Sequence, residues 1–201
     1  MSSELSNPRT VKILETPRLL LREFIPQDTD ALAKVLSDSE TMRYHPAPFD
    51  RAQVEGWIAR NIQRYRDDGV GLWAMLLKSN PCGADLRPGS NHASGTRTGV
   101  SAPHYELIGD CGIILQQLDG EPLYEIGYHL RRDFSGQGLA TEAAIACRDW
   151  AFAHLKTERL ISLIRPENVP SRRVAERVGM TIWREIDWRG LRHYVYSVER
   201  A

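Results

Sequence analysis

Hydrophobic and polar positions follow two periods along the chain, and these separate expected strands from expected helices. Short apolar runs predict strands at 19–23, 71–78, 107–118, 123–130 and 160–164. Apolar residues at helical spacing predict helices at 26–37, 50–66, 139–151 and 171–178. A terminal hairpin is predicted at 181–187 and 191–198, with its turn at Arg189-Gly190.

The order of these elements predicts the fold class. The order β-α-α-β-β-β-α-β-α-β-β indicates mixed α/β structure with one central, mostly antiparallel sheet, unlike the regular βαβ alternation of a dinucleotide fold. Residues 79–104 are rich in Gly, Pro, Ser, Asn and Thr, which predicts a long flexible loop insertion. A length of 201 residues fits a single domain over 1–201.

Composition excludes several classes of protein. A 42% hydrophobic content is typical of a globular chain, and no apolar run approaches the ~20 residues of a membrane helix. The polar N-terminus lacks a signal peptide, so a cytoplasmic protein is expected. The net charge of zero argues against a nucleic-acid partner. Residues 131–201 hold 13 basic and 9 acidic side chains. This small excess of positive charge suits a polyanionic small ligand.

The three cysteines do not form a metal site. Cys82, Cys111 and Cys147 have neither metal-ligand spacing nor a CxxC motif, so no metal is expected. Cys111 follows a strand-like run and Cys147 falls on an apolar helix face. Both are predicted to be buried packing residues.

A glycine-containing loop is the first candidate for chemistry. The strand ending at Leu130 leads to Gly136 and Gly138, and a helix follows at once. Backbone N–H groups at a helix N-terminus bind phosphate, and glycine lets the main chain approach the anion closely. A plain tight turn is the alternative. No Gly-Lys-Ser/Thr follows, which excludes a Walker loop, and no matching acidic ribose-binding strand supports a Rossmann fold.

Four separated stretches resemble the GNAT acyltransferases, specifically the branch of the ribosomal-protein N-terminal acetyltransferases RimJ and RimL. They are ETPRLLLR at 15–22, EIGY at 125–128, GQGLATEA at 136–143, and NVPS at 168–171 continuing to RVGM at 177–180. With the terminal hairpin the resemblance spans residues 15–200. It implies a GNAT-like twisted sheet of about seven strands flanked by four helices.

The resemblance also implies acetyl-CoA as cosubstrate, bound where the strand at 123–130 splays from the strand at 160–164. The backbone of Tyr128, His129 and Leu130 would hold the pantetheine arm as an added strand, and Asn168 would bond that arm. Asp133 stands where the family has Gln or Arg, so backbone amides, with Arg131 or Arg132, would carry the pyrophosphate. The residues expected at the pyrophosphate loop are Ser135, Gly136, Gln137, Gly138, Leu139, Ala140 and Thr141.

Amine acetylation needs a group that takes the amine proton, an oxyanion donor and a proton donor for the CoA thiolate. A strand N–H near Tyr128 can donate a hydrogen bond to the oxyanion. The resemblance implies Ser171 as the thiolate donor; the alternative is that Ser171 only caps the helix at 172–178. Glu125 is the first candidate for the base and Asp110 the second, each with the alternative of an exposed strand carboxylate.

Two further groups of residues carry weaker expectations. Tyr44 and His45 can line the acceptor side, although a lone histidine is more often structural. The tryptophans Trp57, Trp73, Trp183 and Trp188 are expected to pack in the core or on the hairpin.

The resemblance therefore implies an acetyl-CoA-dependent N-acetyltransferase that transfers the acetyl group by direct attack of a primary amine. The leading acceptor is the N-terminal α-amine of a protein or peptide. A small-molecule amine acetyltransferase acting on a polyamine, an amino acid or an antibiotic is the alternative. A non-catalytic CoA-binding module is the alternative from another class. Homodimers are common among similar proteins, so a homodimer is a further expectation.

Overall fold

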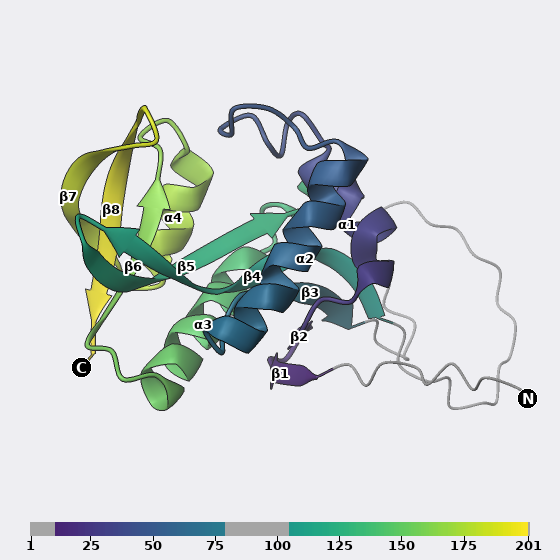
Figure 1. Ribbon diagram of the computed structural model, residues 1–201, viewed down its shortest axis with the longest axis horizontal. Coiled ribbons are helices and arrows are strands. Elements are labelled where there is room, and N and C mark those ends of the chain that lie inside the picture. Colours follow the sequence, from purple (N-terminus) through teal and green to yellow (C-terminus); the bar gives the residue numbers. More distant parts are fainter. Residues whose placement is uncertain (1–10, 79–104, 201) are drawn as a thin grey trace, which may run out of the picture.

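One eight-stranded sheet with four α-helices makes up the described structure, a computed structural model that covers residues 11–78 and 105–200 (Figure 1). The strands are β1 Lys12–Glu15, β2 Leu19–Arg22, β3 Leu72–Lys78, β4 Tyr105–Leu118, β5 Glu121–Leu130, β6 Arg159–Ile164, β7 Thr181–Trp188 and β8 Leu191–Glu199. The helices are α1 Thr29–Leu36, α2 Arg51–Asp67, α3 Leu139–His154 and α4 Val169–Arg177, with 3₁₀ turns η1 Pro26–Asp28 and η2 Arg132–Phe134. The expected insertion at 79–104 and Cys82 lie outside the described residues.

The predicted α/β class and the four helices are confirmed, and the sheet has one strand more than expected. The additional strand β1 pairs antiparallel with β2, with Glu15 opposite Leu20. It holds only four residues and its outer positions are exposed, so it has no alternating pattern long enough to stand out.

Strand order places the one parallel contact of the described sheet in its interior. The order is β1-β2-β3-β4-β5-β6-β8-β7, and every neighbouring pair except β5–β6 is antiparallel. The parallel register has only two pairs, Tyr124 with Leu160 and Glu125 with Ile161. Beyond Glu125 the strand β5 continues to Leu130 alongside β4 alone. The sheet therefore opens into a V between β5 and β6.

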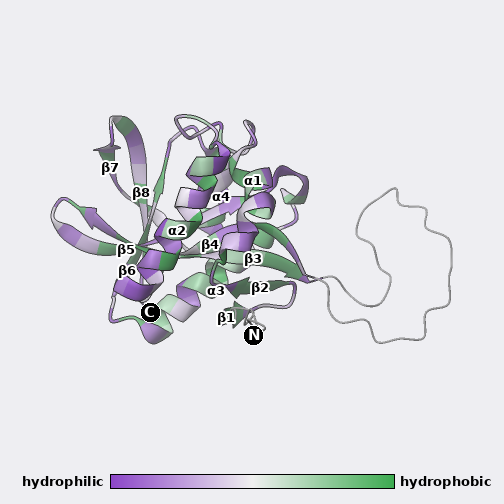
Figure 2. Ribbon diagram, turned by 45° about the vertical axis from the view of Figure 1, so that its right-hand side comes forward, coloured by the Kyte–Doolittle hydropathy of each residue, from purple (hydrophilic) through white to green (hydrophobic). Residues whose placement is uncertain are grey.

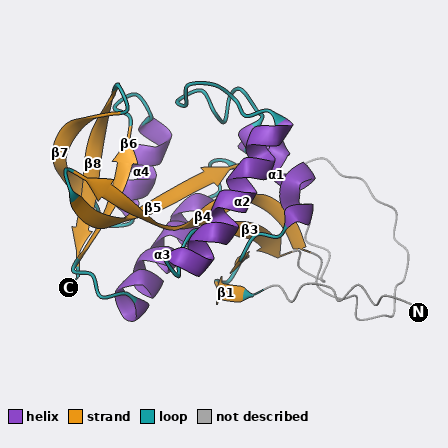
Figure 3. Cartoon of the chain, in the orientation of Figure 1, coloured by secondary structure: helices purple, strands orange, loops and turns teal. Residues whose placement is uncertain are grey.

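Each face of the sheet packs against its own pair of helices. A core that includes Ile126, Cys147 and Ala175 joins the sheet to α3 and α4. A second core that includes Leu36, Ile58 and Leu72 joins it to α1 and α2. Figure 3 shows these helices along the strands, and Figure 2 shows hydrophobic colour along β2 and β3 with mixed colour on the helices.

Alternation along β5 assigns its side chains to the two faces. Ile126 and Tyr128 belong to the α3–α4 core. A Cβ on Gly127 would lie 3.1 Å from Leu72 of the other core, and the ring of His129 contacts Trp57 of α2. Glu125, Gly127 and His129 therefore share the α1–α2 face.

The cysteines and most tryptophans pack as expected. Cys111 and Cys147 are fully buried with their Sγ atoms 3.5 Å apart, which confirms the packing prediction for both. Trp73 is buried in the α3–α4 core, and Trp188 packs against a small cluster near the hairpin. Trp183 is 37% exposed, and its ring lies between the guanidinium groups of Arg159 and Arg184.

Two of the helical segments begin at residues that favour helix starts. Asp50 and Gln53 form a reciprocal capping box at α2, with both hydrogen bonds 2.8 Å long. Pro26 opens η1, which leads directly into α1. Within residues 11–78 and 105–200, none of the helices has the length and apolar content that crossing a bilayer requires.

Candidate active site

The loop between β5 and α3 has the geometry of an anion site. Gly136 and Gly138 have φ of 78° and 77°, a left-handed conformation that strongly favours glycine. Gly138 is the N-cap of α3, and it has no side chain to bond the first-turn N–H groups. Those N–H groups point out of the positive end of a 16-residue helix, which suits a pyrophosphate.

A polar clamp holds this loop against the strands β1 and β2. Arg18 donates from Nη1 to the carbonyl of Gln137 at 2.9 Å and from Nε to Glu142 at 2.6 Å. Glu142 also accepts from the Thr16 hydroxyl at 2.6 Å and from the Arg18 backbone at 3.0 Å. Burial acts to raise the pKa of Glu142, but these hydrogen bonds prevail and lower it. These hydrogen bonds join the stretch 15–22 to the stretch 136–143, which gives a physical reason why both belong to the pattern that resembles the family.

Arg131 is committed to acidic partners within the loop. Its guanidinium donates to Asp133 at 2.7 and 2.9 Å and to Glu106 at 2.7 Å. It also lies 4.5 Å from the centre of the Phe134 ring. Asp133, which departs from the family pattern, is therefore neutralised locally by Arg131. Arg131 stabilises the loop, so the expectation that it assists phosphate finds no support in these contacts.

Glu125 lies at the point where the V opens. It is the last residue of β5 that pairs with β6, and its Oε1 accepts from the backbone N–H of Leu163 at 3.2 Å. Gln116 donates to its Oε2 at 2.7 Å. Burial raises the pKa of Glu125. The two hydrogen bonds and the charges of Arg64 and Arg189 act to lower this pKa, but burial prevails. The alternative of an exposed strand carboxylate is wrong for Glu125, because the side chain bridges the two diverging strands.

Ser171 and Asn168 lie at the start of α4, on the α3–α4 side of the V. The helix is capped by Asn168, whose Oδ1 accepts from the Ser171 backbone N–H at 3.2 Å. The alternative that Ser171 is the cap is therefore wrong, since Ser171 lies in the first turn. The Tyr128 hydroxyl donates to the Ser171 carbonyl at 2.8 Å. This bond ties α4 to the unpaired end of β5, next to the half-buried Ser171 side chain.

Asp110 is fully buried, so the alternative of an exposed strand carboxylate is wrong here too. Its Oδ1 accepts from the backbone N–H and the Nδ1 of His129, at 3.0 and 2.8 Å. Its Oδ2 accepts from the Trp57 indole N–H at 3.0 Å. Trp57 was expected to serve only in packing; it packs against the α1–α2 core and also binds this carboxylate. Asp110 therefore reaches a substrate only through His129.

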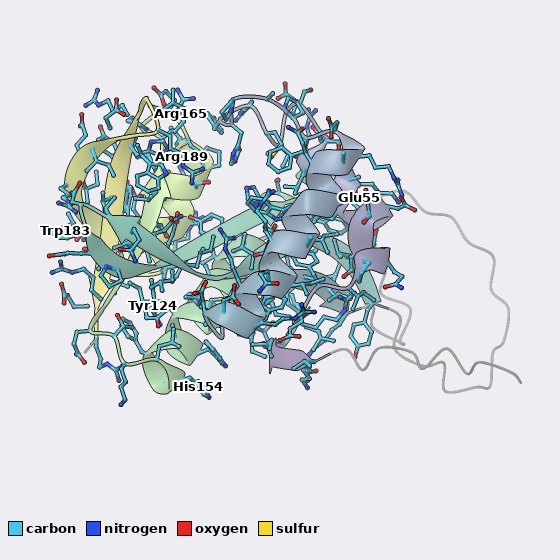
Figure 4. The ribbon with its side chains drawn as sticks, viewed as in Figure 1. Glu55, Tyr124, His154, Arg165, Trp183 and Arg189 are labelled. Carbon is cyan, nitrogen blue, oxygen red and sulfur yellow. The ribbon has the colours of Figure 1, made fainter. Side chains whose placement is uncertain are left out.

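Histidines gather on the same side of the sheet. The His45 ring lies 5.1 Å from that of His129, between centroids. Burial and the neighbouring His129 lower the pKa of His45 to about 4, with smaller contributions from His193 and Arg165. Arg165 donates to the Tyr44 carbonyl at 3.5 Å, so the loop between α1 and α2 reaches the end of β6 (Figure 4). Tyr44 and His45 therefore lie on the α1–α2 side of the V, and their role in lining the acceptor side stays a prediction.

A separate surface pocket of about 420 Å³ lies between η1, α1 and α2. Its lining includes Thr29, Glu55, Ile58 and Ile62. None of the expected site residues lines it. The candidate site is therefore the V between β5 and β6 and not this pocket.

Comparison with known proteins defines the class. The model of the acetyltransferase (GNAT) domain family matches residues 18–181. The protein YkkB of Bacillus subtilis is 33% identical over 168 residues, which cover 83% of this chain and 84% of YkkB. An acetyltransferase structure from Agrobacterium tumefaciens superposes with a TM-score of 0.69 at 28% identity, covering 100% of this chain and 99% of that chain.

The chain belongs to the GNAT acetyltransferase family, as predicted. It is an acyltransferase, and acetyl-CoA is its cosubstrate, because acetyltransferases of this family take the acetyl group from acetyl-CoA.

Proteins named for ribosomal acetylation are more distant. YdaF of Bacillus subtilis, provisionally named a ribosomal N-acetyltransferase, is 30% identical over 139 residues, 66% of this chain and 73% of YdaF. A structure of RimL, a ribosomal L7/L12 α-N-protein acetyltransferase in complex with coenzyme A, has a TM-score of 0.66 at 15% identity. It covers 94% of this chain and 97% of RimL, and at that identity it shows the fold alone.

Proposed function

We propose that the protein transfers the acetyl group of acetyl-CoA by direct attack of a primary amine, and that the acceptor is the N-terminal α-amine of a protein or peptide. The observation that carries this proposal is the V between β5 and β6. It has a phosphate-binding loop at one end and separate polar groups on its two faces. The pantetheine arm lies along the unpaired edge of Tyr128, His129 and Leu130, bonded as an added strand is bonded.

The two faces of the V divide the chemistry. On the α3–α4 face, Ser171 donates a proton to the departing thiolate, and Asn168 holds the turn on which Ser171 lies. On the α1–α2 face, Glu125 and the pair of Asp110 with His129 are the groups able to take a proton from the amine. Backbone N–H groups of β5 near Tyr128 stabilise the oxyanion.

Charge on the acceptor side favours a peptide over a polyamine. Arg64 of α2 and Arg189 of the β7–β8 turn both act electrostatically on Glu125, and Arg165 acts on His45. These arginines, of which Arg165 also pairs with Glu167 at 3.4 Å, repel a polycation such as spermidine or an aminoglycoside. They attract the carboxylates of a peptide. The name of YdaF points to the same acceptor class.

The test measures CoA thiol release with wild-type protein and a panel of amines. Peptides with a free N-terminus are expected to be acetylated, and the same peptides with a blocked N-terminus and a free lysine are the control. Faster release with spermidine or an aminoglycoside would assign the small-molecule alternative. Thermal stabilisation by acetyl-CoA and not by NAD, without thiol release from any amine, would assign the non-catalytic module.

A further inference from the structure

The triad of the buried Asp110 with the half-buried His129 and Trp57 has a geometry that simple packing does not require. Asp110 on β4 and His129 on β5 are direct Cα partners in the antiparallel ladder, and their side chains meet on the α1–α2 face. The carboxylate accepts three hydrogen bonds, two from His129 and one from Trp57. A buried carboxylate bonded in this way is fixed in position and can hold the imidazole in one orientation.

The second ring nitrogen of His129 is the group left for chemistry. When Nδ1–H donates to Asp110, the neutral ring carries its lone pair on Nε2. The side chain keeps 13% exposure, whereas Asp110 has none. His129 is also one of the five β5 residues beyond the last pair with β6, and one of the three expected to bond the pantetheine arm.

We infer that His129 is the catalytic residue that takes the proton from the acceptor amine, and that Asp110 and Trp57 are positioning residues that act through it. The inference rests on the proposed function. It reassigns the base from Glu125, whose oxygens are engaged by Gln116 and by the Leu163 N–H across the strands.

Residues of this chain and solvent account for every proton in the reaction. The ammonium group gives one proton to His129 Nε2, and the freed amine forms the C–N bond with the thioester carbonyl carbon. The C–S bond breaks, the electron pair leaves on sulfur, and Ser171 protonates the thiolate. A second proton from the nitrogen returns to Ser171 through water, while His129 releases its proton to solvent.

The charges around His129 agree with this role. Burial opposes the charged ring, but the charge of Asp110, the hydrogen bond to it and the charge of Glu125 together raise the pKa of His129. From the loop between α1 and α2, His45 faces the ring with a lowered pKa and stays neutral near pH 7. A raised pKa makes the imidazole a stronger base toward the ammonium group of the acceptor.

The experiment measures kcat/KM against pH, at saturating acetyl-CoA, for wild type and four variants. His129→Gln should lower kcat by about 10²–10⁴-fold and remove the acidic limb of the profile, with acetyl-CoA affinity unchanged by calorimetry. Asp110→Asn should move that limb to lower pH, because it removes the carboxylate that raises the His129 pKa. His154→Gln, an exposed histidine on α3, is the control and should match wild type.

Unchanged activity and an unchanged limb in His129→Gln overturn the inference. Loss of the limb in Glu125→Gln instead assigns the proton to Glu125 and also overturns it. If a variant fails to fold, the wild-type limb is measured at several temperatures, since imidazole ionisation is endothermic and carboxylate ionisation nearly athermal. A limb without temperature dependence contradicts His129. Failure of the proposed function is a separate result, namely no thiol release by the wild type with any amine.

Discussion

The phosphate-loop assignment can be tested at Gly138 with one methyl group. Gly138 has φ of 77°, and a Cβ there would lie 3.6 Å from Arg18 Nη2, an ordinary van der Waals contact. Gly138→Ala therefore introduces no clash, and its cost is the left-handed backbone, about 1–2 kcal/mol for a residue with Cβ. For a chain of this size that corresponds to a fall of about 2–8 °C in Tm.

A matched control separates this cost from ligand binding. Gly120, in the turn between β4 and β5, has φ of 85° and nothing within 4 Å of a built Cβ. Gly120→Ala should lose the same free energy of unfolding but keep wild-type acetyl-CoA affinity. Gly138→Ala should relax out of the left-handed conformation and misdirect the first N–H groups of α3, which weakens pyrophosphate binding.

The assay is thermal unfolding with and without acetyl-CoA at about 100 times the wild-type Kd, where a ligand that binds the native state stabilises it by about 2.7 kcal/mol. A 100-fold weaker Kd in Gly138→Ala would reduce this to about 0.4 kcal/mol. Equal ligand-induced shifts in the two variants would refute the reasoning, because the loop would then not depend on the geometry at Gly138.

Three other variants test the remaining parts of the site. Ser171→Ala should lower kcat by about 10²-fold or more with acetyl-CoA affinity unchanged, and equal turnover in single-turnover kinetics would exclude Ser171 as the thiolate donor. Glu142→Gln should cost about 1–3 kcal/mol in urea unfolding at pH 7. Because the folded pKa of Glu142 is lowered, that difference should persist above about pH 5 and disappear as the pH falls through the folded pKa, so a pH-independent difference would contradict the ionic clamp. Arg189→Glu should raise kcat/KM for spermidine relative to a peptide, and an unchanged ratio would remove the charge argument for the acceptor.

Elements with a strong local pattern were predictable from the sequence. α2 carries apolar residues at helical spacing and a capping box at Asp50. β4 and β5 flank the turn at Asp119-Gly120, and both turn residues have the positive φ that the turn requires. β1 was not predicted, because four residues bonded to one neighbour leave too short a pattern. The alternative that Ser171 caps α4 is wrong, because the cap is Asn168; both residue types cap well, and only the side-chain contact distinguishes them.

The candidate site was predictable only where its residues are contiguous in the chain. The glycine loop directly follows β5 in the chain. Its position next to the expected pantetheine edge can therefore be predicted without knowing any long-range contact. Asp110, His129 and Trp57 come from β4, β5 and α2, and only strand register and helix packing bring them together. Alternation along β5 was the available signal: it places Glu125 and His129 on one face and Tyr128 on the other, which assigns the His129 side chain to the acceptor side.

The clamp and the triad show how this chain separates holding acetyl-CoA from acting on the amine. Glu142, Thr16 and Arg18 fix the loop on the α3 side of the sheet, and the four hydrogen bonds of this clamp do not reach the α1–α2 face. Asp110 and Trp57 fix His129 on the opposite face, through bonds that do not involve the loop. Variants of the clamp should therefore change acetyl-CoA affinity with an unchanged pH profile, and variants of the triad should do the reverse. Because the two sets share no partner, their effects on the activation free energy should add in a double variant.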